Sequence, residues 1–319
     1  MRITELNPGD VRRAFYRALG YFPVTIEGRR YKCDTAHMGF WRWVEDGGWE
    51  PQTYKVLSTF LNPQEDYADI GSWIGPTAVY AASRCRRMFC FEPDTTALEY
   101  LLFNLRRNGA GNCTVFSCAL SDSDGFTEMA SFGSALGDSM TSLLNKDAAK
   151  GKLLVPCVSW ASFEKMFGAF SPGFIKMDIE GGEFALIPAM SEFLKKRKPV
   201  LYLSIHPGYC EASRRASVVE SLFDALSFYH CIMTDRFEKT SLSRILRRAD
   251  FAQSSVVSAP GGQAVADAPY GVRRQSEAAT ALWLRRRRSW LQNPAPGPAK
   301  AVSRCACHRT PYCPRFHHV

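Results

Sequence analysis

The sequence predicts an α/β fold, a three-layer sandwich built on a mainly parallel sheet. Short apolar runs alternate with amphipathic segments from about residue 61 to residue 250, which is the pattern of successive βαβ units. A glycine-containing turn follows the first of these runs, and acidic residues stand at the ends of three of them. Ligands of open parallel sheets bind at the carboxyl ends of the strands, so these acids predict a binding site there.

The individual elements follow from turn, capping and propensity signals. Pro76 suits the first turn of a helix, Asp94 can cap the next helix, and Gly109 can end it. Runs of branched and aromatic residues mark the strands. We expect strands at residues 67–70, 88–91, 113–119, 126–130, 153–158, 174–177, 200–205 and 231–234. We expect helices at residues 76–84, 95–108, 161–167, 183–190 and 214–226.

Residues 1–60 are expected to form a small elaboration packed on this domain. The segment 24–33 predicts a hairpin that turns at Gly28, and a helical pattern follows Pro51. Aromatic residues cluster between the two, namely Phe40, Trp41, Trp43 and Trp49. Core packing is the favoured explanation of the tryptophans, and a platform that stacks on sugars is the alternative.

Residues 251–319 differ in composition and are expected to form a low-complexity basic tail, mostly disordered. Ala, Gly, Pro, Ser and Arg dominate there, a composition that cannot bury a core. The tail carries +8 of the chain's net charge of +9 and leaves the other 250 residues at +1. A nearly neutral body gives no reason to expect nucleic acid as a partner. A solvated charge run is therefore the favoured explanation of Arg285–Arg288, with contact to an acidic surface or nucleic acid as the alternative.

The end of the tail holds residue types that bind metals, at spacings that match no standard zinc site. Chance clustering is the favoured explanation of Cys305, Cys307, His308, Cys313, His317 and His318.

Composition also bounds the cellular context that we expect. No apolar run approaches the roughly 20 residues of a membrane helix, and the first residues lack the apolar centre of a signal peptide. Most of the eleven cysteines are scattered singly or lie in expected strands, as buried reduced thiols do. We therefore expect a cytoplasmic protein without a membrane span, and the sequence does not indicate its oligomeric state.

The first candidate site is the glycine turn Asp69–Gly75 together with Glu92, 23 residues after Asp69. Gly71 and Gly75 permit a tight turn and close backbone approach to a ligand. A carboxylate at the end of the second strand can accept both hydroxyls of a ribose. The spacing is not G-x-G-x-x-G, so S-adenosylmethionine (SAM) fits better than a dinucleotide. An ordinary strand–turn–helix is the alternative for the turn alone.

The second candidate site is the acidic run after the expected strand 174–177. Asp178 and Glu180 stand in the turn into the next helix, where they could orient a hydroxyl, act as a base or hold a divalent ion. Glu183 is equally explained as a carboxylate that favours the helix N-terminus. One strand later, His206 could accept a proton near neutral pH, or it could simply cap its loop.

Taken together, these motifs resemble the FkbM family of SAM-dependent methyltransferases. The resemblance extends from about Trp49 to Thr234 and joins several motifs in the same order. They are Trp49–Pro51, Asp69–Gly75, Phe91–Asp94, Asn104, Asn108, Ala119–Gly125, Ile175–Gly181, Glu183 and Pro199. The resemblance implies a class I methyltransferase (Rossmann-like) fold and methyl transfer to oxygen, often on sugars or natural products.

The resemblance also implies roles for individual residues. The loop that surrounds the methionine part of SAM in the family corresponds to Asp69, Gly71, Ser72 and Gly75 in this chain. Glu92, with the adjacent Pro93, takes the place of the ribose carboxylate, and Ser121 and Asp122 that of the adenine contacts. Asp178 and Glu180 take the place of active-site acids, and Asp178 also borders the cofactor. Ser72 and Trp73 depart from the residues common in the family, so the shape of the first loop does not carry over.

We therefore expect a SAM-dependent methyltransferase that acts on a hydroxyl of a sugar, a glycan or another natural product. The bases considered are His206 and Asp178, with Glu180 third. Mg²⁺ would suit oxygen ligands at this cluster, but a metal is not the favoured interpretation. The alternatives are N-methylation of a protein or nucleic acid, and a catalytically silent SAM-fold binding module. Residues 131–152, rich in Ser, Gly and Ala, form either a lid over the cleft or a surface loop.

Overall fold

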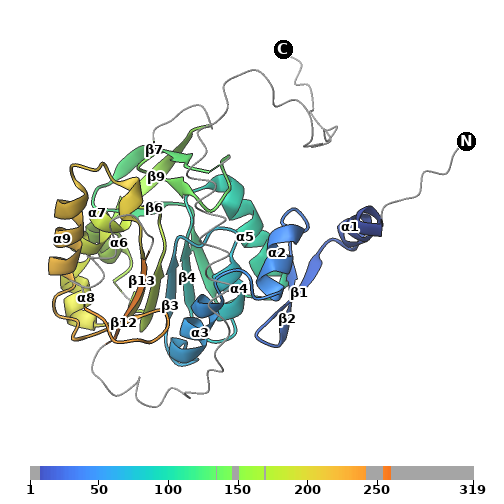
Figure 1. Ribbon diagram of the computed structural model, residues 1–319, viewed down its shortest axis with the longest axis horizontal. Helices are drawn as coiled ribbons and strands as arrows, with labels where there is room; N and C mark the ends of the chain where they lie inside the picture. The colour runs from blue at the N-terminus through green and yellow to red at the C-terminus, as the bar shows by residue number, and fades with distance from the viewer. Residues whose placement is uncertain (1–7, 134, 146–150, 169, 242–253, 260–319) are drawn as a thin grey trace, which may run out of the picture. The chain divides into compact units, whose positions relative to one another are not determined.

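The computed structural model describes residues 8–133, 135–145, 151–168, 170–241 and 254–259. A seven-stranded sheet forms its centre, in the order β12-β13-β11-β10-β3-β4-β5 (Figure 1). β13 runs antiparallel to both of its neighbours, and every other neighbouring pair is parallel. The strands are β3 (Tyr67–Ile70), β4 (Met88–Phe91), β5 (Cys113–Phe116), β10 (Phe174–Met177), β11 (Val200–Ile205), β12 (Cys231–Thr234) and β13 (Ser254–Ala259).

Helices cover both faces of this sheet because its strand residues alternate between two apolar cores. Tyr67 and Phe174 belong to one buried cluster, whereas Ala68 and Ile175 belong to the other, as the two-residue period of a strand requires. The first cluster packs against α3 (Pro51–Phe60), α4 (Pro76–Ala81) and α5 (Thr95–Arg107). The second packs against α6 (Trp160–Met166), α7 (Glu183–Ala189), α8 (Ser191–Arg197) and α9 (Arg215–Ala225). The expected three-layer sandwich is confirmed.

β13 corrects the predicted start of the tail. The last predicted strand ends at residue 234 and the predicted disordered tail begins at residue 251, but residues 254–259 form a strand between β11 and β12. Val256 and Val257 are buried there. They are the only large apolar residues of the strand, so its signal was too weak to stand out from the surrounding Ala-, Gly- and Ser-rich sequence. The rest of the expected tail, including Arg285–Arg288 and the terminal Cys and His residues, lies outside the described residues.

A smaller sheet stands beside the carboxyl ends of the central strands. Its order is β6-β9-β7-β8. The expected strand 113–119 divides here, because β5 ends at Phe116 and the chain enters the second sheet at Ala119. The strands are β6 (Ala119–Ser121), β7 (Gly125–Ser131), β8 (Thr141–Ser142) and β9 (Leu153–Ser159).

The N-terminal segment consists of α1 (Pro8–Leu19), the hairpin β1 (Phe22–Ile26) and β2 (Arg29–Cys33), and α2 (Met38–Glu45). Trp41 is fully buried, which agrees with the core-packing interpretation, whereas Trp43 is 43% exposed. Within the described ranges, no helix has both the length and the apolar character needed to cross a bilayer.

Hydrogen bonds from α5 fix this segment to the central domain. The Asn104 side chain accepts from the Asp34 backbone N–H at 2.7 Å and donates to the Asp34 carboxylate and the Ile74 carbonyl. Asp34 also accepts from the Trp41 indole. Asn108 makes a reciprocal pair of hydrogen bonds with the backbone of Lys32. Both asparagines belong to the motifs identified in the sequence, and the structure gives them this docking role.

Replacing Asn104 by Ala should lower the free energy of unfolding by roughly 2–4 kcal/mol, because it leaves buried polar groups without partners. The more exposed Asn108→Ala should cost about 1 kcal/mol. Urea unfolding followed by circular dichroism measures both changes. Asn62→Ala, at an exposed position, serves as the control. Equal losses in Asn104→Ala and Asn62→Ala would contradict the docking role.

Candidate functional site

A cleft opens at the carboxyl ends of β3, β4 and β10, with about 630 Å³ of empty space. Its walls come from these strand ends, from the second sheet and from residues 138–143. Among the predicted site residues it is lined by Gly71, Glu92, Pro93, Asp178 and Glu180. This is where open α/β sheets bind their ligands.

The glycines of the first turn are required by backbone geometry. Gly71 has φ 83°, and a Cβ atom there would lie 1.9 Å from the Asp178 carbonyl oxygen. Gly75 has φ 89° and precedes α4, where a Cβ atom would meet Leu101 of α5 at 2.7 Å. Only glycine is accommodated at these positions. The turn is therefore packed tightly between β10 and α5 as well as facing the cleft.

Asp69 lies beneath the turn rather than in the cleft wall. Its side chain is fully buried, accepts from Thr77 Oγ1 at 2.6 Å, and lies 3.2 Å from Lys176 Nζ. Ser72 is also buried, and its hydroxyl donates to the Asp69 carbonyl. The predicted contact of Asp69 and Ser72 with the methionine part of SAM therefore remains a prediction, and the role visible in the structure is to hold the turn.

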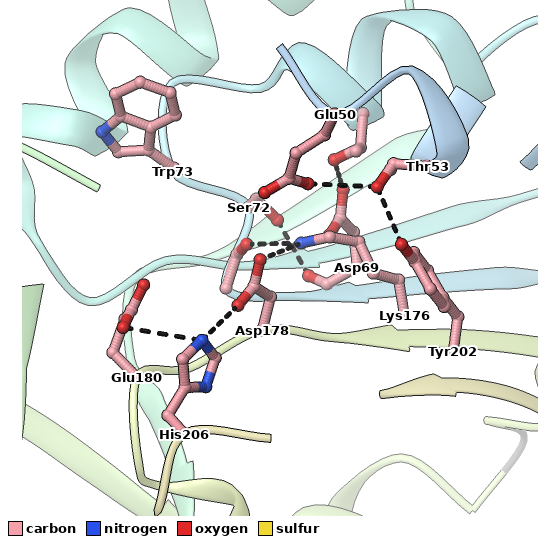
Figure 2. A network of polar contacts seen from close by, with 12 residues as sticks. Glu50, Thr53, Asp69, Ser72, Trp73, Lys176, Asp178, Glu180, Tyr202 and His206 are labelled. Carbon is pink, nitrogen blue, oxygen red and sulfur yellow. Dashed lines mark hydrogen bonds and ion pairs between the residues drawn. The ribbon is translucent and has the colours of Figure 1, made fainter. Parts of the chain in front are cut away.

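Lys176 is the buried cation around which this region is arranged. It is 5% exposed, donates to the Gly71 carbonyl at 3.1 Å and lies 3.9 Å from Asp178 Oδ2. Burial lowers the pKa of Lys176, but the charges of Asp69 and Asp178 more than offset this, so its pKa is raised and the amine stays charged. One ammonium group thus connects the turn to both acidic strand ends (Figure 2).

Glu50 brings a further carboxylate to this network from the N-terminal segment. It precedes α3 with a left-handed φ of 35°, and its carboxylate accepts from Thr53 Oγ1 at 3.0 Å. Thr53 in turn contacts the Tyr202 hydroxyl at 2.8 Å. The residue as a whole is exposed, but Figure 2 shows its side chain directed toward Lys176.

Glu92 is held by backbone amides at the end of β4. Its two carboxylate oxygens accept from the Trp73 and Asp94 N–H groups at 2.7 and 2.8 Å. Burial raises the pKa of Glu92 to about 7, although these two hydrogen bonds oppose the shift. Each oxygen retains lone-pair capacity for a further donor from a ligand. The carboxylate is thus fixed in position at the cleft wall.

The segment predicted as either a lid or a surface loop is fastened over the cleft. Trp73 donates its indole N–H to the Gly137 carbonyl at 2.8 Å, and the Gly137 N–H donates to Asp94 at 2.6 Å. Thr141 also donates to Asp94, and Ser142 donates to the Glu180 carbonyl at 2.6 Å. Residues 138, 139, 141 and 143 line the cleft, so the segment 135–145 forms one wall of the site. Residues 146–150, within the same predicted segment, lie outside the described residues.

Ser121 and Asp122 lie at the end of β6, outside the cleft lining. Asp122 is exposed, and its carboxylate accepts from the Ser121 and Ser123 hydroxyls at 3.2 Å. The three preceding residues line the cleft instead: Cys118, Ala119 and Leu120. Their apolar surface is suited to an aromatic ring. A contact of Ser121 and Asp122 with adenine remains a prediction.

Asp178, Glu180 and His206 come together although they follow different strands. His206 Nε2 lies 3.3 Å from Asp178 Oδ1 and 3.6 Å from Glu180 Oε2 (Figure 2). β10 and β11 are parallel neighbours, so the residues that follow them meet at one edge of the sheet. The sequence predicted all three residues, and the structure joins them in one cluster.

Glu183 orients the His206 ring by contacting its Nδ1 atom. This fully buried carboxylate lies 3.2 Å from His206 Nδ1 and accepts the backbone N–H groups of His206 and Gly181. Burial lowers the pKa of His206, but Glu183, Glu180 and Asp178 together raise it to about 10. Burial raises the pKa of Glu180 to about 7, against the opposing charge of His206. Glu183 therefore does more than favour the N-terminus of α7.

The sequence did not predict Lys176 and Glu50 as members of the site, and it left Glu183 explained as an acid at a helix N-terminus. Lys176 offered a signal, because a lysine inside an otherwise apolar strand must find a buried anion. Glu50 offered only its place before Pro51 at the start of a helix, and its approach to Lys176 depends on how the N-terminal segment docks.

Comparison with known proteins gives one family and several structural likenesses. The family model described as the methyltransferase FkbM domain matches residues 68–230. The seven-stranded sheet with one antiparallel strand is the class I SAM-dependent methyltransferase fold. No curated protein matches the chain significantly.

Among solved structures, FkbM methyltransferase from Methylobacillus flagellatus is similar, with 19% identity and a TM-score of 0.40. The match covers 62% of this chain and 44% of that protein, so the chain spans less than half of its length. M. jannaschii TYW2 in complex with AdoMet has 14% identity and a TM-score of 0.37, with 75% of this chain and 85% of that chain covered. Aeropyrum pernix fibrillarin with bound SAM has 12% identity and a TM-score of 0.37, with 75% of this chain and 82% of that chain covered.

Replacing Lys176 by Met should lower the free energy of unfolding by about 3–5 kcal/mol, because Asp69 is left as an uncompensated buried charge. Adding Asp69→Asn should recover part of the loss, since it removes that charge. Urea unfolding at pH 7.5 measures both. Lys152→Met is the matched control, because Lys152 pairs with Glu128 at the surface and should cost no more than about 1 kcal/mol. Similar losses in the two lysine variants would contradict a central role for Lys176.

Proposed function

The chain belongs to the FkbM methyltransferase domain family, and on this premise we propose that it transfers the methyl group of SAM to a hydroxyl oxygen. The acceptor is a sugar, a glycan or another polyhydroxylated natural product. The observation that carries the proposal is the juxtaposition of the cleft at the strand ends with the Asp178–Glu180–His206 cluster at one sheet edge.

The cofactor side of the proposal rests on the chemistry of the cleft wall. Glu92 presents a carboxylate that two backbone amides hold in position, as the recognition of two neighbouring ribose hydroxyls requires. Cys118, Ala119 and Leu120 offer apolar surface for a base. The turn after β3 brings backbone close to the methionine part, and the cluster lies at the far end, where the methyl group would be presented.

The proposed class of acceptor rests on the negative charge of the carboxylates in and beside the cleft. Asp178 and Glu180 line the cleft, and Glu50 adds a carboxylate beside Lys176. Carboxylates accept hydrogen bonds from hydroxyl groups and repel phosphates. This favours an uncharged polyol over a nucleic acid, in agreement with the nearly neutral charge of residues 1–250.

The chemical step needs alignment and a proton acceptor. SAM supplies an electrophilic methyl group on a sulfonium, which departs as neutral S-adenosylhomocysteine. A lone pair of the acceptor oxygen forms the new C–O bond as the C–S pair returns to sulfur, and the hydroxyl proton passes to a carboxylate of the Asp178–Glu180–His206 cluster, in which the charged His206 holds the carboxylates in place. Holding the two reactants in line supplies much of the rate, and removing the proton contributes typically 10²–10⁴-fold.

Glu92→Gln should weaken SAM binding roughly 10- to 100-fold at pH 8, because charge-assisted hydrogen bonds to the ribose are lost. Since the pKa of Glu92 is raised to about 7, the ionised form that accepts these bonds is depleted below that pH. Wild-type affinity should therefore fall about tenfold between pH 8 and pH 6, while the variant stays nearly flat. Isothermal titration calorimetry measures both, with Glu99→Gln on the exposed face of α5 as the control. Unchanged binding by Glu92→Gln would remove the ribose assignment.

Methyl-labelled SAM, incubated with the chain and a panel of glycans, should label a sugar oxygen, which NMR of the product identifies as a methyl ether. His206→Ala should lower turnover 10²–10⁴-fold while leaving SAM affinity unchanged, because His206 does not line the cofactor cleft. Full activity in His206→Ala would exclude His206 from the step. Label on nitrogen would favour the N-methyltransferase alternative, and SAM binding with no labelled acceptor would favour a silent binding module.

A further inference from the structure

Three buried polar atoms converge at the end of β10 and β11 without a hydrogen-bond partner. They are Asp178 Oδ1, Glu180 Oε2 and His206 Nε2. One donor atom from each residue lies within 4.8 Å of the other two. Buried polar groups normally have partners, because leaving one unpaired costs about 1–3 kcal/mol. His206 Nε2 lies 3.3 Å from Asp178 Oδ1 and 3.6 Å from Glu180 Oε2, so the three atoms form a compact set of donors that a bound ion could satisfy together.

The histidine is prepared for a ligand on its Nε2 side. The His206 side chain is 3% exposed, and its other nitrogen, Nδ1, lies 3.2 Å from Glu183 Oε1. An ion that displaces the proton from Nε2 would meet a lone pair beside Asp178 and Glu180, while Nδ1 keeps its N–H toward the Glu183 carboxylate. A carboxylate behind an imidazole is the arrangement that orients histidines bound to metals and increases their basicity. Glu183 is itself fixed by the backbone N–H groups of Gly181 and His206.

The backbone also holds the two carboxylates in place. Glu180 has a left-handed φ of 51°, which is uncommon for a residue other than glycine and persists where surrounding contacts enforce it. Ser142 donates to its carbonyl at 2.6 Å. The Asp178 N–H donates to the Ile70 carbonyl, and Gly71 packs against the Asp178 carbonyl. The donor atoms are therefore positioned before any ligand arrives.

We propose that Asp178, Glu180 and His206 form a binding site for a divalent transition-metal ion. Two carboxylate oxygens and one imidazole nitrogen supply three ligands, and three protein ligands leave positions open for water or substrate, as in catalytic metal sites. The nitrogen ligand favours a first-row transition ion over Mg²⁺ or Ca²⁺, which prefer oxygen ligands throughout.

The charge around the cluster supports a cation. Asp178, Glu180 and Glu183 place three carboxylates around one imidazole. Lys176 approaches Asp178 only at 3.9 Å and is shared with Asp69 at 3.2 Å. Carboxylates that crowd together in a partly buried site are costly unless a cation or hydrogen-bond donors compensate them.

The site faces the cleft, because Asp178 and Glu180 both line it. An ion held there would lower the pKa of an acceptor hydroxyl that binds to it. This role rests on the proposed methyl transfer, whereas the binding site itself does not.

Mn²⁺ is the appropriate probe for the full chain. The terminal residues include Cys305, Cys307, His308 and Cys313, which would bind Zn²⁺ and obscure the result, whereas thiolates bind Mn²⁺ weakly. Electron paramagnetic resonance of free Mn²⁺ and calorimetry should both report one strong site per chain. Mg²⁺ at equal concentration should displace little of it.

Asp178→Asn, Glu180→Gln and His206→Gln should each weaken Mn²⁺ binding at least tenfold, and Glu183→Gln about 10- to 100-fold through the ring orientation. Glu192→Gln, an equivalent change at an exposed position of α8, should leave the affinity unchanged. Thermal melts identify any variant that fails to fold, so that only folded variants are compared with the wild type.

A wild-type chain that binds no Mn²⁺ at 1 mM, or variants that bind it as tightly as wild type, would overturn the metal site. Methyl transfer by a metal-free chain that also fails to bind Mn²⁺ would overturn this inference and leave the proposed function standing. Tight Mn²⁺ binding by a chain that labels no acceptor would support the metal site and contradict the proposed methyl transfer.

Discussion

The buried ion pair between Lys176 and Asp69 is the interaction on which the site depends. β3 and β10 are parallel neighbours, and Lys176 is in register with Asp69, so one lysine reaches the acid of the adjacent strand and the glycine turn that follows it. Two buried charges carry a large desolvation cost, which only close pairing offsets. The pair therefore contributes more to geometry than to stability: it fixes the turn, holds Asp178 nearby and sets the floor of the cleft.

Much of the fold could be predicted from the sequence, because the strands of a buried parallel sheet are short apolar runs with clear turn signals. β13 could not, since Val256 and Val257 are its only large apolar residues and its place between β11 and β12 is a long-range pairing. The split of the strand expected at 113–119 was missed for a similar reason. Residues 113–119 carry no turn signal that would divide them, and only the second sheet separates β5 from β6.

The candidate site, too, could be predicted from the sequence only in part. Residues at strand ends, such as Glu92, Asp178 and His206, are visible in sequence because parallel strands bring their carboxyl ends to one edge. Residues that act through another group are not. Glu183 looked like an ordinary acid at a helix start, and its function as an anchor for His206 appears only when β11 lies beside the turn into α7. Asp69 is the reverse case, because this strand-end acid pairs with Lys176 and Thr77, a role that its position in the sequence does not reveal, while its contact with SAM stays a prediction.

The buried carboxylates at the two ends of the cleft are compensated by different groups, and this difference indicates different functions for the two ends. Glu92 is compensated by two backbone N–H groups, so the chain itself satisfies it and it can recognise a neutral polyol such as ribose. Asp178 and Glu180 each keep a buried oxygen without a hydrogen-bond partner, next to a histidine nitrogen in the same condition. A buried polar atom without a partner gains an interaction when a ligand binds to it, which favours ligand binding at this end of the cleft. The far end of the cleft is therefore where an additional cation and an acceptor hydroxyl would be held, and the amide-bound end is where a preformed nucleoside site would lie.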